Sequence, residues 1–236
     1  MFPTKQKNSG QGGLELYLKR IFTLMFGAVA VTALASYLTI WGGGFRFLLN
    51  GTGTGFGALY YILMFGGLAL SIWAQVRAFS IKPATAAALL FGYAAIIGIV
   101  MTPLITVALA VNPASILYAF ILAAVMFGCM ALFGYKTAKN LSFLGVFLMM
   151  GMIGLILVGL ASFIWPLGST FATIVCLIGV LIFALFTAYD MQNLKNAYRA
   201  LGDDYQKNQM AVLGALHLYI SFIAMFQYLL SLLNRN

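Results

Sequence analysis

The chain is short of charge, and shortest of acidic charge. Only four of its 236 residues are Asp or Glu, and all charged residues together make up 7%. A soluble domain carries roughly 25% charged residues. The chain has 63% hydrophobic residues and a mean hydropathy of +1.02, so it has too few polar residues to form a water-soluble surface. The composition therefore excludes a soluble globular protein and indicates a chain that lives in a lipid bilayer.

Histidine and cysteine are also scarce. His217 is the only histidine, which excludes a histidine-rich metal site. Cys129 and Cys176 both lie inside apolar segments, without the spacing of a disulfide framework or a metal site. Every Lys lies in a loop or tail, which excludes a retinal protein, because that class needs a lysine within the membrane. We therefore expect no cofactor.

Basic residues outnumber acidic ones, and the formal net charge is +9. A positive charge of this size can indicate nucleic-acid binding. Here the basic residues lie between apolar segments and form no continuous stripe, so we expect no nucleic-acid partner. Their positions are those of topological anchors at a membrane surface.

Long apolar runs make up most of the chain. About 20 apolar residues are needed to cross a bilayer. Runs of that length predict seven spans, at residues 21–41, 58–75, 84–111, 116–134, 141–163, 171–190 and 211–233. Pro103 is expected to kink or tilt the long third span. We predict an all-α membrane protein in which residues 1–16 form a polar, disordered cytoplasmic tail and residues 17–236 form the seven-helix domain. A polar connector is expected at 193–209.

The basic residues are distributed unequally between the two sides of these spans. If the N-terminus is cytoplasmic, 11 of the 13 Lys and Arg residues lie on the cytoplasmic side, and only Arg46 and Arg235 lie on the other. An excess of Lys and Arg in cytoplasmic loops sets the orientation of membrane proteins. The count predicts a cytoplasmic N-terminus, an outer C-terminus and an odd number of spans.

Asp190 differs from the other acidic residues in its position. It ends the sixth apolar run, whereas Glu15, Asp203 and Asp204 lie in polar segments. A carboxylate in such a segment costs free energy unless it has water, a cation or a proton. An ionisable residue at such a place is therefore a candidate functional site.

Three other polar residues fall at a similar predicted depth near the cytoplasmic surface. Arg77 ends the second span, while His217 and Ser221 lie four residues apart in the seventh, on one helical face. We predict a site in which the charge state of Asp190 biases helix packing. Arg77 would pair with Asp190, and His217 would sense protons.

Each of these residues also has a structural interpretation. Asp190 could be a solvated helix end, Arg77 a topological anchor, His217 a hydrogen-bonded packing residue and Ser221 a helix–helix contact. His217 and Ser221 on one helix lack an orienting acid and oxyanion donors for a serine hydrolase. We therefore do not expect an enzyme.

Three stretches of the sequence carry a family resemblance. They are 139–145 (KNLSFLG), 186–195 (FTAYDMQNLK) and 213–223 (LGALHLYISFI). Together they resemble the Bax inhibitor-1 family (transmembrane BAX inhibitor motif proteins), including its small bacterial members, over the membrane region from Tyr17 onward. The resemblance implies a seven-helix bundle with the last helix central. It also implies a multi-pass protein of the bacterial inner membrane.

The activity implied by the resemblance is a pH-sensitive calcium leak. Two aspartates form the sensor in family members studied as channels; one matches Asp190, and the other corresponds to Ser221 in this chain. An Arg near the end of span two is expected to latch the sensor, and Arg77 or Gln75 falls in that region. Calcium prefers about six to eight oxygen ligands. The single Asp190 is therefore predicted to be a weak calcium contact, with His217 taking over some proton sensing.

Two functions remain open from the sequence. The leading hypothesis is a pH-sensitive cation leak channel or sensor with a modified sensor, with calcium as the transported ion. The alternative is a non-channel regulatory protein that binds a membrane-anchored ATP-dependent protease, or another quality-control partner, through residues 1–13 and its helices. The resemblance supports this alternative, because some bacterial relatives that resemble this chain also carry Ser in span seven and are associated with such protease regulation. The expected partners are the lipid bilayer and, in the alternative, this protease. The sequence leaves the oligomeric state open.

Overall fold

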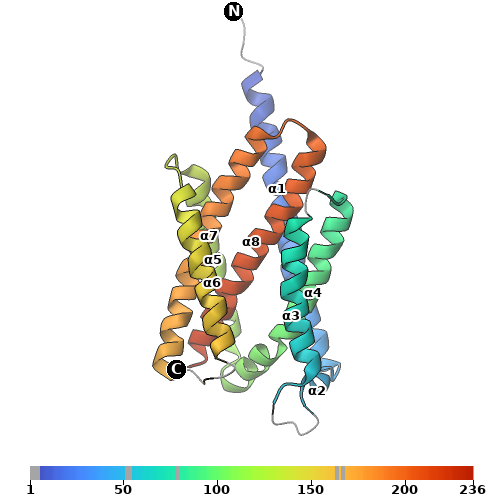
Figure 1. The fold of residues 1–236 in the computed structure, drawn as a ribbon, viewed down its shortest axis with the longest axis vertical. Helices are drawn as coiled ribbons and strands as arrows, with labels where there is room; N and C mark the ends of the chain where they lie inside the picture. The colour runs from blue at the N-terminus through green and yellow to red at the C-terminus, as the bar shows by residue number, and fades with distance from the viewer. Residues whose placement is uncertain (1–5, 51–54, 78–79, 163–164, 166–167, 236) are drawn as a thin grey trace, which may run out of the picture. The chain divides into compact units, whose positions relative to one another are not determined.

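The structure is a computed structural model that describes residues 6–50, 55–77, 80–162, 165 and 168–235. Within these ranges the chain is helical, and the only β feature is an isolated bridge between Leu49 and Phe56. The helices are α1 (Gln6–Trp41), α2 (Phe45–Leu48), α3 (Ala58–Val76), α4 (Pro83–Val111), α5 (Ala114–Lys136), α6 (Ser142–Ala161), α7 (Ser169–Ala200) and α8 (Asp204–Leu233) (Figure 1). The prediction of an all-α protein is confirmed.

Seven of these helices are long and apolar enough to cross a membrane, which confirms the predicted number of spans. Only the four-residue α2, in the glycine-rich connector after α1, is too short. Helices suit this setting because lipid offers no hydrogen-bond partner, so each backbone amide must be satisfied within its own segment. In α8, 72% of the apolar window is buried. Its central position and the cytoplasmic N-terminus stay predictions.

Two helices extend beyond their predicted apolar runs. α7 continues ten residues past Asp190 to Ala200, and α8 begins at Asp204. The predicted polar connector at 193–209 is therefore wrong, and only residues 201–203 separate the two helices. α1 begins at Gln6, so residues 6–16 are helical where the sequence predicts a disordered tail, and residues 1–5 lie outside the described ranges. A hydropathy pattern identifies the apolar part of a helix. It does not identify polar helical turns that extend the helix beyond its apolar run.

The chain divides into two compact units. The first contains the described residues up to Pro103 together with Leu194–Tyr219. It thus combines α1, α2, α3 and most of α4 with the end of α7 and the beginning of α8. Thr32 on α1 joins three of these helices, because its Oγ1 bonds the carbonyl of Ala94 at 3.1 Å and the Tyr219 hydroxyl at 2.6 Å. Tyr93 packs edge-on against Tyr219, with their ring centroids 5.9 Å apart.

The second unit contains Leu104–Asn193 and the described residues from Ile220 onward. Its core is aromatic: Phe222 on α8 meets Phe120 and Phe127 of α5 edge-on, with both centroid separations at 5.7 Å. Polar bonds fix the end of α8. The Ser115 hydroxyl donates to Asn234 Oδ1 at 2.8 Å, and Arg235 donates to a carbonyl at the start of α7. This unit carries Asp190 and Ser221.

Candidate functional site

Asp190 lies inside α7 and is 8% exposed. The alternative interpretation of a solvated helix end is therefore wrong, because the helix continues and the side chain is buried. A buried carboxylate must be neutral or compensated by other groups, since removing an isolated charge from water is costly. Gain or loss of a proton at this position therefore changes the energy of the helix packing around it.

The α7 segment around Asp190 approaches α5 closely. A Cβ atom added at Gly134 of α5 would collide with the backbone carbonyl of Ala188 on α7. Only glycine allows the two backbones to come so near, as small residues do at helix contacts in membranes. Thr187, also in this segment, is fully buried, and its hydroxyl bonds the carbonyl of Phe183 at 2.9 Å.

Gln192, two residues after Asp190, fixes α7 to the connector between α5 and α6. Its Oε1 accepts the backbone N–H of Leu141 at 2.8 Å, and its Nε2 donates to the carbonyl of Lys139 at 2.7 Å. The side chain is buried; its bond to Leu141 is buried and its bond to Lys139 is partly buried, and an unpaired backbone group in a buried position is costly. The amide thus acts as a clamp that positions the turn of α7 carrying Asp190.

Ser221 lies in the same unit as Asp190 and is 3% exposed. Its neighbour Phe222 packs against two phenylalanines of α5, so this part of α8 belongs to the core of the second unit. Among the described residues no group of three His, Cys, Asp or Glu side chains could hold a metal ion. Asp190 as a weak calcium contact stays a prediction.

His217 lies in the first unit, where α8 faces α3. Its Nε2 is 3.1 Å from Oε1 of Gln75 on α3. Gln75 also donates from Nε2 to the carbonyl of Ser71 at 3.2 Å, which orients the amide. The geometry fits the structural interpretation of a hydrogen-bonded packing histidine, and its proton sensing stays a prediction.

Arg77 caps the end of α3 and is exposed. Its backbone N–H bonds the carbonyl of Trp73 at 3.0 Å. Arg77 belongs to the first unit and Asp190 to the second, so the latch between them stays a prediction. Gln75, the other candidate that the sequence offers near the end of span two, contacts His217 of α8.

Sequence reasoning missed Gln192 and the bonds made by Thr32. The available signal was a polar side chain within or beside an apolar run, the same signal that singled out Asp190. The sequence does not indicate which residues these side chains bond to, because the hydrogen-bond partners are distant in the chain. Gln192 pairs with backbone groups more than fifty residues earlier in the chain, and Thr32 pairs with Ala94 and Tyr219.

The seven apolar helices and the buried polar residues define a multi-pass membrane protein. The family model described as inhibitor of apoptosis-promoting Bax1 matches residues 14–236, and the chain belongs to this Bax inhibitor-1 family. An uncharacterized protein of Caulobacter vibrioides is 36% identical over 97% of this chain and 92% of its own length. Uncharacterized protein RP147 of Rickettsia prowazekii is 31% identical, covering 99% and 95%.

The inner membrane protein YbhL of Escherichia coli is 39% identical over 140 residues, which are 58% of each chain. Together with the seven apolar helices, this similarity supports a multi-pass protein of the bacterial inner membrane.

Proposed function

We propose that this chain passes or senses cations across the bacterial inner membrane, with Asp190 as the charged switch and calcium as the candidate ion. The observation that carries the proposal is a carboxylate buried within a membrane-spanning helix and positioned by the Gln192 clamp. A buried ionisable residue in a membrane helix is expensive, and such residues mark ion pathways and proton relays.

The switch works through the cost of burying charge. When Asp190 is ionised, the second unit must accommodate a carboxylate by pairing it or by admitting water or a cation. When Asp190 is protonated, this requirement disappears and the surrounding helices pack around a neutral group. The protonation state of one residue thus selects between two arrangements of α7, which is a pH-dependent gate.

The test is flux through the full chain reconstituted in liposomes that contain a calcium-sensitive dye, measured across a pH series. Asp190→Asn keeps the shape of the side chain and removes its titration, so the pH dependence of the flux should disappear. Glu15→Gln is the matched control, because Glu15 is exposed on α1 and the substitution removes the same charge. If Asp190→Asn leaves the flux and its pH profile as in the unmodified protein, Asp190 is not the switch.

One observation favours the alternative, a regulatory protein that binds a membrane-anchored protease without conducting ions. Asp190 is the only acidic residue of the second unit, and one carboxylate is a poor calcium site. Co-purification of the full chain with membrane proteases, compared with a chain that lacks residues 1–13, tests this function. Loss of a bound protease with flux intact would favour it, whereas equal recovery by both chains would argue against a role for the tail.

A further inference from the structure

The first unit contains a cavity of about 340 Å³, open to its surface, that the proposed ion function does not use. It is bounded by α1, the end of α7 and the beginning of α8. The lining residues are Gly13, Leu16, Tyr17, Arg20, Tyr198, Asp204, Lys207 and Asn208. The volume lies within the range of small-molecule sites, about 300–1,000 Å³. The cavity is therefore large enough for a polar headgroup or a small anion.

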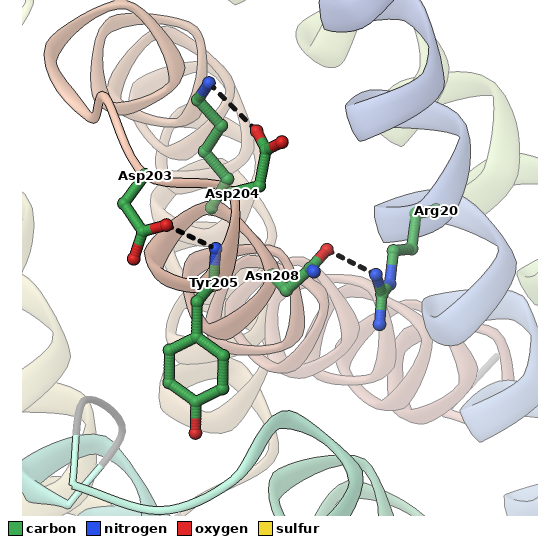
Figure 2. Close-up of polar contacts among 6 residues, drawn as sticks. Arg20, Asp203, Asp204, Tyr205 and Asn208 are labelled. Carbon is green, nitrogen blue, oxygen red and sulfur yellow. Dashed lines mark hydrogen bonds and ion pairs between the residues drawn. The ribbon is translucent and has the colours of Figure 1, made fainter.

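Two cations line this cavity from different helices. Figure 2 shows Arg20 extending from α1 toward Asn208 of α8, to whose Oδ1 its guanidinium donates. Lys207 approaches from α8, with Nζ 3.3 Å from Asp204 Oδ1 and 5.1 Å from the centroid of the Tyr198 ring. A guanidinium has five N–H donors in a planar fork, and the bond to Asn208 occupies one. The guanidinium can therefore bind a second oxygen ligand.

Asp204 is the one carboxylate in the lining, and it opposes binding of an anion. It is 93% exposed and pairs with Lys207, so its charge is turned toward water and is partly balanced. Counting Arg20 and Lys207 against Asp204, the lining has one excess positive charge. The cavity thus favours an anion over a cation.

Tyr17, one of the lining residues, has a buried hydroxyl that lacks a partner among the described residues. Tyr17 is 7% exposed, and its Oη has no hydrogen-bond partner among the described residues. Buried polar groups are normally satisfied, so an exception calls for an explanation such as a bound water, ion or ligand. Gly13 contributes to the same wall, because a Cβ there would collide with the Tyr198 hydroxyl. A bound oxygen ligand would supply the acceptor that Tyr17 lacks.

We propose that this cavity binds a phosphate group, held by the guanidinium of Arg20 and the ammonium of Lys207, with Tyr17 donating to a phosphate oxygen. Arginine is suited to this role because its fork matches two phosphate oxygens. The cavity lies at the polar end of the apolar span that begins at Gly12. Basic pockets between membrane helices near the membrane surface bind the headgroups of anionic lipids.

The experiment measures binding to the full chain, purified in detergent and stripped of lipid, by native mass spectrometry and by ligand-dependent thermal stabilisation. The probes are phosphatidylglycerol, zwitterionic phosphatidylcholine and inorganic phosphate. Phosphatidylglycerol should bind more tightly than phosphatidylcholine. Arg20→Gln and Lys207→Gln should each weaken binding about 10-fold or more, since each removes a charge-assisted contact.

Lys19→Gln is the matched control, because it removes the same charge from an exposed neighbour outside the lining, and it should leave affinity within about 2-fold. Tyr17→Phe should weaken binding several-fold without changing the charge. If Arg20→Gln does not fold, Lys207→Gln and Tyr17→Phe still decide the question. Binding of phosphatidylglycerol alone would identify a lipid headgroup as the ligand, and binding of both anions would show that phosphate suffices. Binding of neither anion, or equal weakening by Lys19→Gln, would overturn the proposal.

Discussion

Gln192→Leu tests the clamp that positions the Asp190 segment. The substitution keeps the approximate size of the side chain and removes both bonds, at 2.8 Å to the Leu141 N–H and at 2.7 Å to the Lys139 carbonyl. Each bond has a net worth of about 1 kcal/mol, and a buried group left unpaired costs about 1–3 kcal/mol. With the buried Leu141 N–H left unpaired and the bond to the partly buried Lys139 carbonyl lost, we expect the free energy of unfolding to fall by about 2–4 kcal/mol.

The assay is equilibrium unfolding in mixed micelles with increasing denaturing detergent, followed by circular dichroism. Gln206→Leu is the control with the same chemical change, because Gln206 is exposed on α8, and its effect should stay within about 0.5 kcal/mol. Gln192→Glu keeps an acceptor for Leu141 and loses the donor to Lys139, so it should also be less stable than the unmodified protein. If Gln192→Leu unfolds with the free energy of the Gln206→Leu control, the amide does not act as a clamp.

Two further predictions concern close contacts in each unit. Gly134→Ala should lower the free energy of unfolding by about 1–3 kcal/mol, because the new methyl group collides with the α7 backbone. Gly128→Ala, which meets nothing within 4 Å, should instead be neutral or stabilising in the same unfolding assay; equal effects of the two would contradict the packing argument. Thr32→Val and Tyr219→Phe each remove their shared 2.6 Å bond and should cost about 0.5–1.5 kcal/mol. In a double-mutant cycle their effects should be non-additive, and strict additivity would show that the bond contributes no stability.

The number of spans could be predicted from the sequence because span length depends on a local quantity. A bilayer of fixed thickness requires a run of apolar residues, and the seven predicted runs correspond to the seven helices that are long and apolar enough to cross a membrane. Helix ends in water depend on neighbours from other parts of the chain. The tilted rings of Tyr17 and Tyr198 pack against each other, with centroids 5.2 Å apart, so the beginning of α1 and the end of α7 stabilise each other outside the predicted spans. Hydropathy contains no information about that contact.

The candidate site was only partly predictable for a similar reason. The cost of a carboxylate among apolar residues identified Asp190 without knowledge of its surroundings. The sequence placed Asp190 at a helix end because the apolar run ends there, but the polar turn after it remains helical. The clamp at Gln192 requires the connector between α5 and α6 to meet α7, which a pattern within one helix cannot indicate.

Ser221→Asp distinguishes a modified ion sensor from a packed helix contact. The substitution places a second carboxylate at a position that is 3% exposed, in the unit that already holds Asp190. An uncompensated buried charge costs about 3–5 kcal/mol, so the variant should be less stable than Ser221→Ala. If the two positions share a cation site, calcium should restore much of that loss, because calcium prefers several carboxylate oxygens. The same calcium should leave Ser221→Ala and the double variant Ser221→Asp/Asp190→Asn unchanged. Destabilisation that calcium does not relieve would mean that Ser221 fills a helix contact and that the two positions do not form a sensor.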